Sequence, residues 1–149
     1  MWRDTATAGR EQARDLAARL ERRAKAADEI SAREAYLGLL EIAPGEHVLD
    51  VGSGSGAVTR EIARRVGSRG RVVGLDQSPE LLTVARELAR EAGLDDRVEF
   101  REGDALRLPF PDRSFDVVLC VTVLSHVPQG EAAIPEPVSY THLTLPTKA

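Results

Sequence analysis

Two helices are predicted in the N-terminal part of the chain. From Arg10 to Glu41 the sequence is rich in Ala, Leu, Arg and Glu and contains no Pro, a composition that favours helix. Ser31 followed by Glu34 has the spacing of a capping box, which predicts a second helix that restarts there and continues through Leu40. The apolar positions of the first helix recur at spacings of three and four residues, at Leu16, Leu20, Ala24 and Ala27. Because this stripe is thin, we expect the first helix to pack loosely or to act as a lid.

The pattern changes after Pro44 and Gly45, which predict a turn. Short runs rich in β-branched residues then alternate with amphipathic stretches, as in parallel strands joined by crossover helices. Ser78 and Pro79 mark a helix start, with Ser as N-cap and Pro at the first helical position, and Gly93 suits the C-terminal cap. The expected strands are His47 to Val51, Arg71 to Leu75, Arg97 to Arg101 and Phe115 to Val121, and the helix between the first two covers Gly56 to Val66.

Composition narrows the class of protein. The 149 residues suit one ordinary domain, and 42% hydrophobic with 30% charged residues predicts a folded core. A net charge of -4 and 4% aromatic residues disfavour nucleic acid as a partner, since they predict neither a positive field nor a base-stacking platform. No apolar stretch is long enough to cross a membrane, and the N-terminus lacks the apolar segment of a secretory signal. With Cys120 as the single cysteine, we expect a cytoplasmic protein without an internal disulfide.

Candidate chemistry begins at the end of the first predicted strand. The segment VLDVGSGSG at residues 48–56 is an apolar strand that contains Asp50 and runs into three alternating glycines, Gly52, Gly54 and Gly56. Glycine permits the sharp turn between strand and helix and lets the backbone approach a ligand without Cβ atoms in the way. A glycine-rich loop alone is weak evidence, because turns and tight helix–strand packing also use glycine. Its place between a strand and a helix favours ligand binding.

An acidic residue follows at the end of the second predicted strand. Asp76 lies twenty residues beyond Gly56, where a carboxylate can accept hydrogen bonds from both hydroxyls of a ribose. This spacing predicts a nucleoside ligand. Gly52, Gly54 and Ala57 also satisfy the dinucleotide pattern G-x-G-x-x-G/A, which keeps an NAD-dependent oxidoreductase open as an alternative.

The acidic residues favour a cationic ligand over a pyrophosphate. Asp50, Asp76 and Asp104 all fall at or near the carboxyl ends of predicted strands, where they disfavour an anion. S-adenosylmethionine fits this set of acidic residues, because it combines an adenosine with a sulfonium and an ammonium group and carries no phosphate. We expect its single carboxylate to bind the backbone amides of the glycine loop.

Three motifs in order resemble those of the class I S-adenosylmethionine-dependent methyltransferases, in particular the domain type of the ubiquinone and menaquinone biosynthesis enzymes. They are VLDVGSGSG at residues 48–56, VVGLDQSPELL at residues 72–82 and GDALRLPFPDRSFDVVLC at residues 103–120, within a match over residues 36–134. The resemblance implies an α/β fold, a Rossmann-like three-layer sandwich with N-terminal helices. Its four predicted strands would form an incomplete parallel sheet in the order 3-2-1-4. It also implies S-adenosylmethionine as the cofactor.

The resemblance further assigns roles to individual residues. The residues implied to hold the methionine portion are Asp50, Gly52, Ser53, Gly54 and Gly56. The residues implied to hold the adenosine are Asp76 at the ribose, with Gln77, Asp104 and Ala105 at the adenine. Cys120, at the end of the fourth predicted strand, would lie near the methionine end while also packing as a small buried side chain.

Methyl transfer from a sulfonium is an in-line displacement, which needs alignment and exclusion of water rather than a nucleophilic residue. A base is needed only for an acceptor that must lose a proton. His126 is the candidate, although it can equally pack against or cap the next helix. No residues have metal-ligand spacing, so no metal is expected. The predicted function is methyl transfer to a small-molecule acceptor, and the alternatives are an NAD-dependent oxidoreductase domain and an inactive nucleoside-binding remnant.

The chain is expected to divide into three parts. Residues 1–43 would form a helical cap or lid, residues 44–134 the cofactor-binding core, and residues 135–149, with three prolines and no periodicity, a non-native or disordered tail. The string SYTHLTLPTK in this tail resembles a translated sequencing-adapter sequence, and the strands that follow the fourth in the family are not predicted, so we expect a C-terminally truncated protein. Val117 to Val121 would then be an exposed edge strand through which the chain could self-associate.

Overall fold

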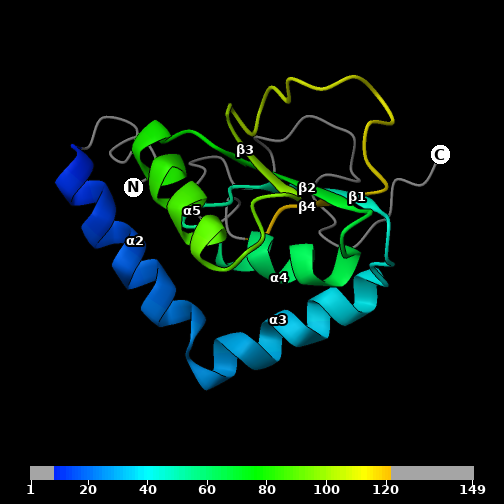
Figure 1. Cartoon of the computed structure of the whole chain (residues 1–149), viewed down its shortest axis with the longest axis horizontal. Coiled ribbons are helices and arrows are strands. Elements are labelled where there is room, and N and C mark those ends of the chain that lie inside the picture. Colours follow the sequence, from blue (N-terminus) through cyan, green and yellow to red (C-terminus); the bar gives the residue numbers. More distant parts are fainter. Residues whose placement is uncertain (1–8, 122–149) are drawn as a thin grey trace.

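A computed structural model describes residues 9–121 of the chain (Figure 1). Residues 1–8 and 122–149 are outside this range, so His126 and the predicted tail lie outside the described residues. The elements follow one another as helices α2 and α3 and then as alternating strands and helices. Their bounds are α2 Arg10–Ala24, α3 Ala27–Leu40, β1 His47–Val51, α4 Ala57–Val66, β2 Arg71–Asp76, α5 Pro79–Glu91, β3 Val98–Glu102 and β4 Val117–Leu119.

The four strands form one parallel sheet in the order β3-β2-β1-β4, which confirms the predicted order. In register, Asp50 of β1 lies between Gly74 of β2 and Leu119 of β4, and Gly74 pairs in turn with Phe100 of β3. Because all four strands run in the same direction, their carboxyl ends lie at one edge of the sheet. The segments that follow β1, β2 and β3 therefore leave from the same edge.

Helices cover one face of the sheet (Figure 1). The main core lies between this face and helices α3 and α4, and α5 packs on β3 through Leu82, Ala85, Ala89 and Phe100. The fully buried members of the main core include Leu37, Leu40, Val48, Ile62, Val66, Val72, Val117 and Leu119. Gly56, the N-cap of α4, has a φ of 88°, and a Cβ there would lie 2.9 Å from Phe100 Cζ. Only glycine allows both this backbone conformation and this contact.

A loop covers the opposite face. Apolar side chains of residues 103–116 pack there against a second cluster formed by Leu49, Val51, Val73, Leu75, Val118 and Cys120. The rings of Phe110 and Phe115 meet edge to face at 5.0 Å between centroids, and the guanidinium of Arg101 lies 4.9 Å from the centroid of Phe110. Within residues 9–121 no helix covers this face. The described part therefore supplies the sheet and one helical layer of the predicted sandwich.

The break between the two N-terminal helices was predicted wrongly. The second helix begins at Ala27 with Ala26 as N-cap, and Ser31 is an exposed residue inside it. Arg33 donates to the carbonyl of Ala24 across the break, and two acidic residues, one of which is Glu29, lie in the first turn. These acidic side chains favour the positive end of the helix dipole, so the helix starts at them and not at the Ser31 capping pattern.

The contacts of α2 also differ from the predicted stripe. Its buried residues are Ala13 and Ala17, whereas Leu16 and Leu20 are only half-buried. Small alanine side chains let the helix pack closely against α5, and Arg14 forms an ion pair with Glu87 at 3.6 Å. The first helix is therefore held against the body of the fold through its alanine face.

Strand β4 is shorter than the predicted Phe115–Val121 at both ends, since it begins at Val117 and ends at Leu119. The preceding residue, Asp116, contacts β1 at His47 in two ways. The amide of Asp116 donates to the carbonyl of His47, and the Asp116 carboxylate accepts from the amide of His47, both at 2.8 Å. The carboxylate takes the place of a main-chain acceptor, so the ladder starts one residue later. Phe115 belongs instead to the cluster under the loop.

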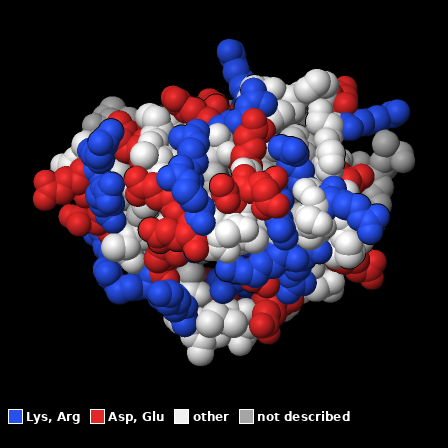
Figure 2. Space-filling view, in the orientation of Figure 1, with Lys and Arg blue, Asp and Glu red and all other residues white. Residues whose placement is uncertain are grey.

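The face of the molecule drawn in Figure 2 is polar and mixed in charge. Figure 2 shows basic and acidic side chains interleaved over the face that carries α2 and α3, without a continuous basic surface on that face. No helix within residues 9–121 has the length and apolar character needed to span a membrane.

Candidate functional site

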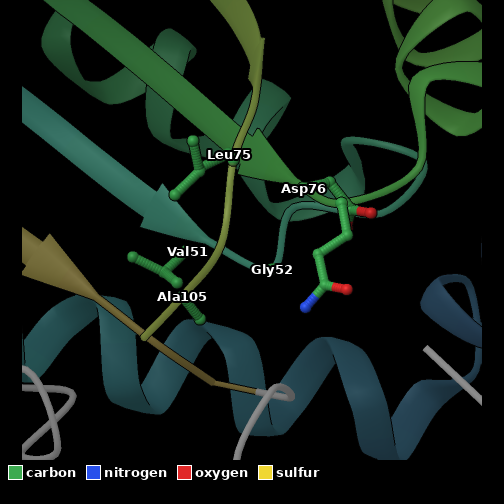
Figure 3. Close-up of a pocket in the computed structure, with 7 residues that line it drawn as sticks. Val51, Gly52, Leu75, Asp76 and Ala105 are labelled. Carbon is green, nitrogen blue, oxygen red and sulfur yellow. The ribbon is translucent and has the colours of Figure 1, made fainter. Parts of the chain in front are cut away.

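A hollow lies at the carboxyl ends of β1 and β2, beside the segment that follows β3 (Figure 3). The empty space at this hollow, open solvent included, is about 210 Å³. The lining residues are Val51, Gly52, Leu75, Asp76, Gln77, Gly103 and Ala105. Gly52, Asp76, Gln77 and Ala105 were predicted from the motifs, whereas the other three were not. Val51 and Leu75 read as ordinary core residues in the sequence, because their position at strand ends becomes a signal only when the two strands are known to be neighbours.

The glycine loop is bound to the end of β2 by its own amides. The amides of Gly52 and Ser53 both donate to the carbonyl of Leu75, at 2.7 and 3.0 Å, and the amide of Gly56 donates to Ser53 at 2.9 Å. Gly52 and Gly54 have φ angles of 76° and 56°, which the turn requires. These three amides hold the loop to the protein, and the expected binding of a cofactor carboxylate by amides of this loop stays a prediction.

Asp76 is buried at the rim of the hollow, with 3% of its surface exposed. One carboxylate oxygen accepts from the amide of Gly54 at 2.9 Å, and the other accepts from the amide of Ser78 at 3.0 Å. Burial raises the pKa of Asp76 to about 6, against the lowering effect of these backbone hydrogen bonds. The backbone of Gln77 also lowers this pKa through a hydrogen bond, and since a carboxylate has about four acceptor sites, Asp76 keeps capacity for a ligand hydroxyl.

Asp50 lies near Asp76 on the helix-covered face of the sheet. It is 3% exposed, and Thr59, in the first turn of α4, donates to it at 2.7 Å. Burial raises the pKa of Asp50 to about 7, the Thr59 hydrogen bond lowers it, and the charge of Asp76 raises it. Burial and then Asp50 also raise the pKa of Tyr36 on α3 to about 12. Two buried carboxyl groups that repel each other make this end of the sheet favourable for a cation.

The segment after β3 approaches the hollow through its backbone. The amide of Gly103 donates to the carbonyl of Asp76 at 3.0 Å, and a Cβ at Gly103 would lie 2.6 Å from Leu75 Cδ1. Ala105 lines the hollow, and Figure 3 shows its side chain near the end of β1. The Asp104 side chain is exposed and accepts from the amide of Leu106 at 2.9 Å, so it is bonded to its own loop and does not line the hollow.

Two further predicted residues lie beside the hollow. Ser53 is 9% exposed, and its hydroxyl has no hydrogen-bond partner among the described residues. Cys120 is 2% exposed within the apolar cluster under the loop, where burial and then the charge of Asp50 raise the pKa of its thiol to about 12. Its thiol is therefore protonated near neutral pH and packs as an apolar group. Within residues 9–121 no group of three or more His, Cys, Asp or Glu side chains could hold a metal ion.

Together, the parallel order β3-β2-β1-β4, the glycine turn after β1 and the acidic residue ending β2 define a Rossmann-like domain of the kind that binds nucleoside cofactors. The chain belongs to the methyltransferase-domain family, whose model matches residues 48–139. This family and its structural neighbours imply S-adenosylmethionine as the cofactor.

Relatives and solved structures agree with this family. The chain is 33% identical to a demethylmenaquinone methyltransferase of Lactobacillus johnsonii over 104 residues, which is 70% of this chain and 43% of that protein. It is 40% identical to the cycloartenol-C-24-methyltransferase of Arabidopsis thaliana over 104 residues, 69% of this chain and 30% of that protein. The chain thus spans less than half the length of these curated relatives. A SAM-dependent methyltransferase from Aquifex aeolicus matches with a TM-score of 0.59 and 25% identity over 78% of this chain and 57% of that one.

The residues at the hollow fit the chemistry of this cofactor. Asp76 offers acceptor sites for hydroxyl groups, and the pair Asp50 and Asp76 favours positive charge. The apolar side chains of Val51, Leu75 and Ala105 suit a flat heterocycle.

Proposed function

We propose that this chain binds S-adenosylmethionine in the hollow at the ends of β1 and β2 and functions in methyl transfer to a small-molecule acceptor. The observation that carries the proposal is Asp76, a buried carboxylate that lines the hollow and accepts from the backbone amides of Gly54 and Ser78. The names of the two relatives support an apolar acceptor of the quinone or sterol class. The cofactor would supply a methyl group already activated on a sulfonium.

The residues of the chain would bind and orient the cofactor. Asp76 would accept from the ribose hydroxyls, and Gln77 and Ala105 would border the adenine beside Val51 and Leu75. Asp50, joined to Thr59, would stabilise the positive charges at the methionine end. The role given to Asp104 at the adenine would require its side chain to leave the amide of Leu106. His126 stays a candidate base for an acceptor that loses a proton, outside the described residues.

The test is thermal unfolding of the chain with and without S-adenosylhomocysteine, the product form of the cofactor, with NAD as the control ligand. We expect S-adenosylhomocysteine to raise the midpoint in the wild-type chain and not in Asp76→Ala, and NAD to leave both unchanged. Stabilisation by NAD alone would support a nicotinamide-dependent oxidoreductase. If neither ligand stabilises a folded sample, the remaining interpretation is that the chain is an inactive remnant.

A further inference from the structure

Glu21, near the end of α2, contacts the glycine loop and the helix that follows it. Its carboxylate accepts from the hydroxyl of Ser55 at 2.5 Å with one oxygen and from the guanidinium of Arg60 with the other. Arg60 also donates to the carbonyl of Ser55 at 3.1 Å. The three residues therefore form a closed ring of hydrogen bonds between α2, the loop and the first turn of α4.

This ring is shielded from solvent to an unusual degree for the surface of this fold. The side chains of Arg60 and Glu21 are 12% and 20% exposed, and Ser55 is 3% exposed. The other ion pair between α2 and the body of the fold, Arg14 with Glu87, is 57% and 39% exposed. Ion pairs in solvent contribute little, whereas loss of one partner from a shielded pair leaves the other charge uncompensated. The two pairs on one helix therefore make a matched comparison.

The ring adjoins Gly54, the residue whose amide donates to the proposed ribose-binding carboxylate of Asp76. Ser55 follows Gly54, whose amide donates to Asp76 at 2.9 Å. Leu20, the neighbour of Glu21, packs on the same glycine, with its Cδ1 3.4 Å from the position that a Cβ of Gly54 would take. Two consecutive residues of α2 thus contact two consecutive residues of the loop that holds Asp76.

We propose that Glu21 is a positioning residue for the cofactor. Its hydrogen bonds join Ser55 and Arg60 to α2 and so hold Gly54 in place against Asp76. Packing of α2 against the loop is then coupled to ligand binding in the hollow. This inference rests on the proposed function, since it concerns the same site. Coupling is reciprocal, so a docked α2 that favours the ligand must itself be stabilised by the ligand to the same extent. The first helix then acts as a reporter of cofactor binding.

The experiment measures S-adenosylhomocysteine affinity by calorimetry and hydrogen exchange of the α2 and Gly54 amides, with and without that ligand. Glu21→Ala removes both acceptor bonds and leaves the charge of Arg60 without its carboxylate partner, so we expect affinity to fall about tenfold and ligand protection of α2 to be lost. Glu21→Gln keeps one acceptor oxygen and should lose about threefold. Arg14→Ala, which removes the exposed ion pair on the same helix, should match the wild type in both measurements.

The outcomes separate the two proposals. If the wild-type chain does not bind S-adenosylhomocysteine, the proposed function fails, and the positioning role fails with it. If the wild type binds and Glu21→Ala and Glu21→Gln bind equally well, only the positioning role is overturned, even where their unfolding midpoints are lower. A merely structural role would lower those midpoints and leave the exchange of the Gly54 amide and the ligand affinity unchanged. Should Glu21→Ala fail to fold, Glu21→Gln alone still decides.

Discussion

The amide of Gly54 donates to the carboxylate of Asp76 at 2.9 Å, across 22 residues of sequence. This hydrogen bond joins the glycine turn after β1 to the acidic end of β2, the two features that the motifs singled out separately. Its acceptor is buried, so the bond is shielded from water and holds the loop in one position. The geometry of the proposed site depends on this pair.

Replacing Asp76 tests that dependence without removing the side chain's volume. In Asp76→Asn one oxygen becomes an amide that cannot accept, so either the Gly54 or the Ser78 amide loses its partner. We expect a cost of about 1–3 kcal/mol in the free energy of unfolding, together with loss of stabilisation by S-adenosylhomocysteine. Denaturant unfolding and a thermal-shift titration measure the two effects. Asp104→Asn, at the exposed carboxylate outside the hollow, is the control and should leave stability unchanged.

The stability of the fold should fall as pH rises through the weakly acid range. The folded-state pKa values of Asp50 and Asp76 are raised from 3.8 to about 7 and about 6 by burial. Between about pH 4 and pH 7 the folded chain therefore holds protons that the unfolded chain releases, so their contribution to the free energy of unfolding decreases with pH. Asp50→Asn removes one of these groups and keeps an acceptor for Thr59.

The measurement is the difference in free energy of unfolding between Asp50→Asn and wild type at several pH values. We expect this difference to shift in favour of the variant as pH rises from 5 to 8, by at most about 1.4 kcal/mol per pH unit. Using the difference cancels the titration of groups that do not interact with Asp50, and leaves that of Asp50 and of its neighbour Asp76. A difference that is constant with pH would contradict the raised pKa of Asp50.

The same carboxyl groups predict a pH-dependent preference for the charged form of the cofactor. S-adenosylmethionine carries a sulfonium charge that S-adenosylhomocysteine lacks, and ionised Asp50 and Asp76 attract that charge. We expect the affinity of S-adenosylmethionine relative to S-adenosylhomocysteine to increase from pH 5.5 to pH 7.5, as measured by calorimetry. Equal pH profiles for both ligands would show that the sulfonium does not sense these carboxylates. In Asp50→Asn the increase should be smaller.

Glycine at position 56 is required by the backbone and by packing, whereas glycine at position 38 is not. Gly56→Ala would place a Cβ 2.9 Å from Phe100 Cζ at a φ of 88°, so we expect destabilisation of about 2 kcal/mol or more. Gly38 is exposed within α3 and has nothing within 4 Å of its Cβ position, so Gly38→Ala should stabilise by about 0.5–1 kcal/mol. Denaturant midpoints of the two variants should move in opposite directions.

Local features of the fold were predictable because they depend on neighbouring residues. The strand His47–Val51 and the helix start at Ser78 and Pro79 were predicted correctly, since alternation, capping and proline act within a few positions. The start of the second helix was not, because the acidic side chains of Asp28 and Glu29 in its first turn outweigh the capping pattern at Ser31. Likewise, the start of β4 depends on how Asp116 bonds to His47, far away in the chain.

The sequence by itself determined the order of strands and helices, the glycine turn and the acidic residue that ends β2, because each is encoded by adjacent residues. The sheet order was predicted as well, from the resemblance of the three motifs to a known family and not from any single segment. Only the tertiary structure decided which polar groups meet. Glu21 reaches Ser55 across 34 residues, and Gly54 reaches Asp76 across 22. It also decided the raised pKa values of Asp50 and Asp76. Burial and distance set both properties, and these arise only when segments remote in sequence pack together.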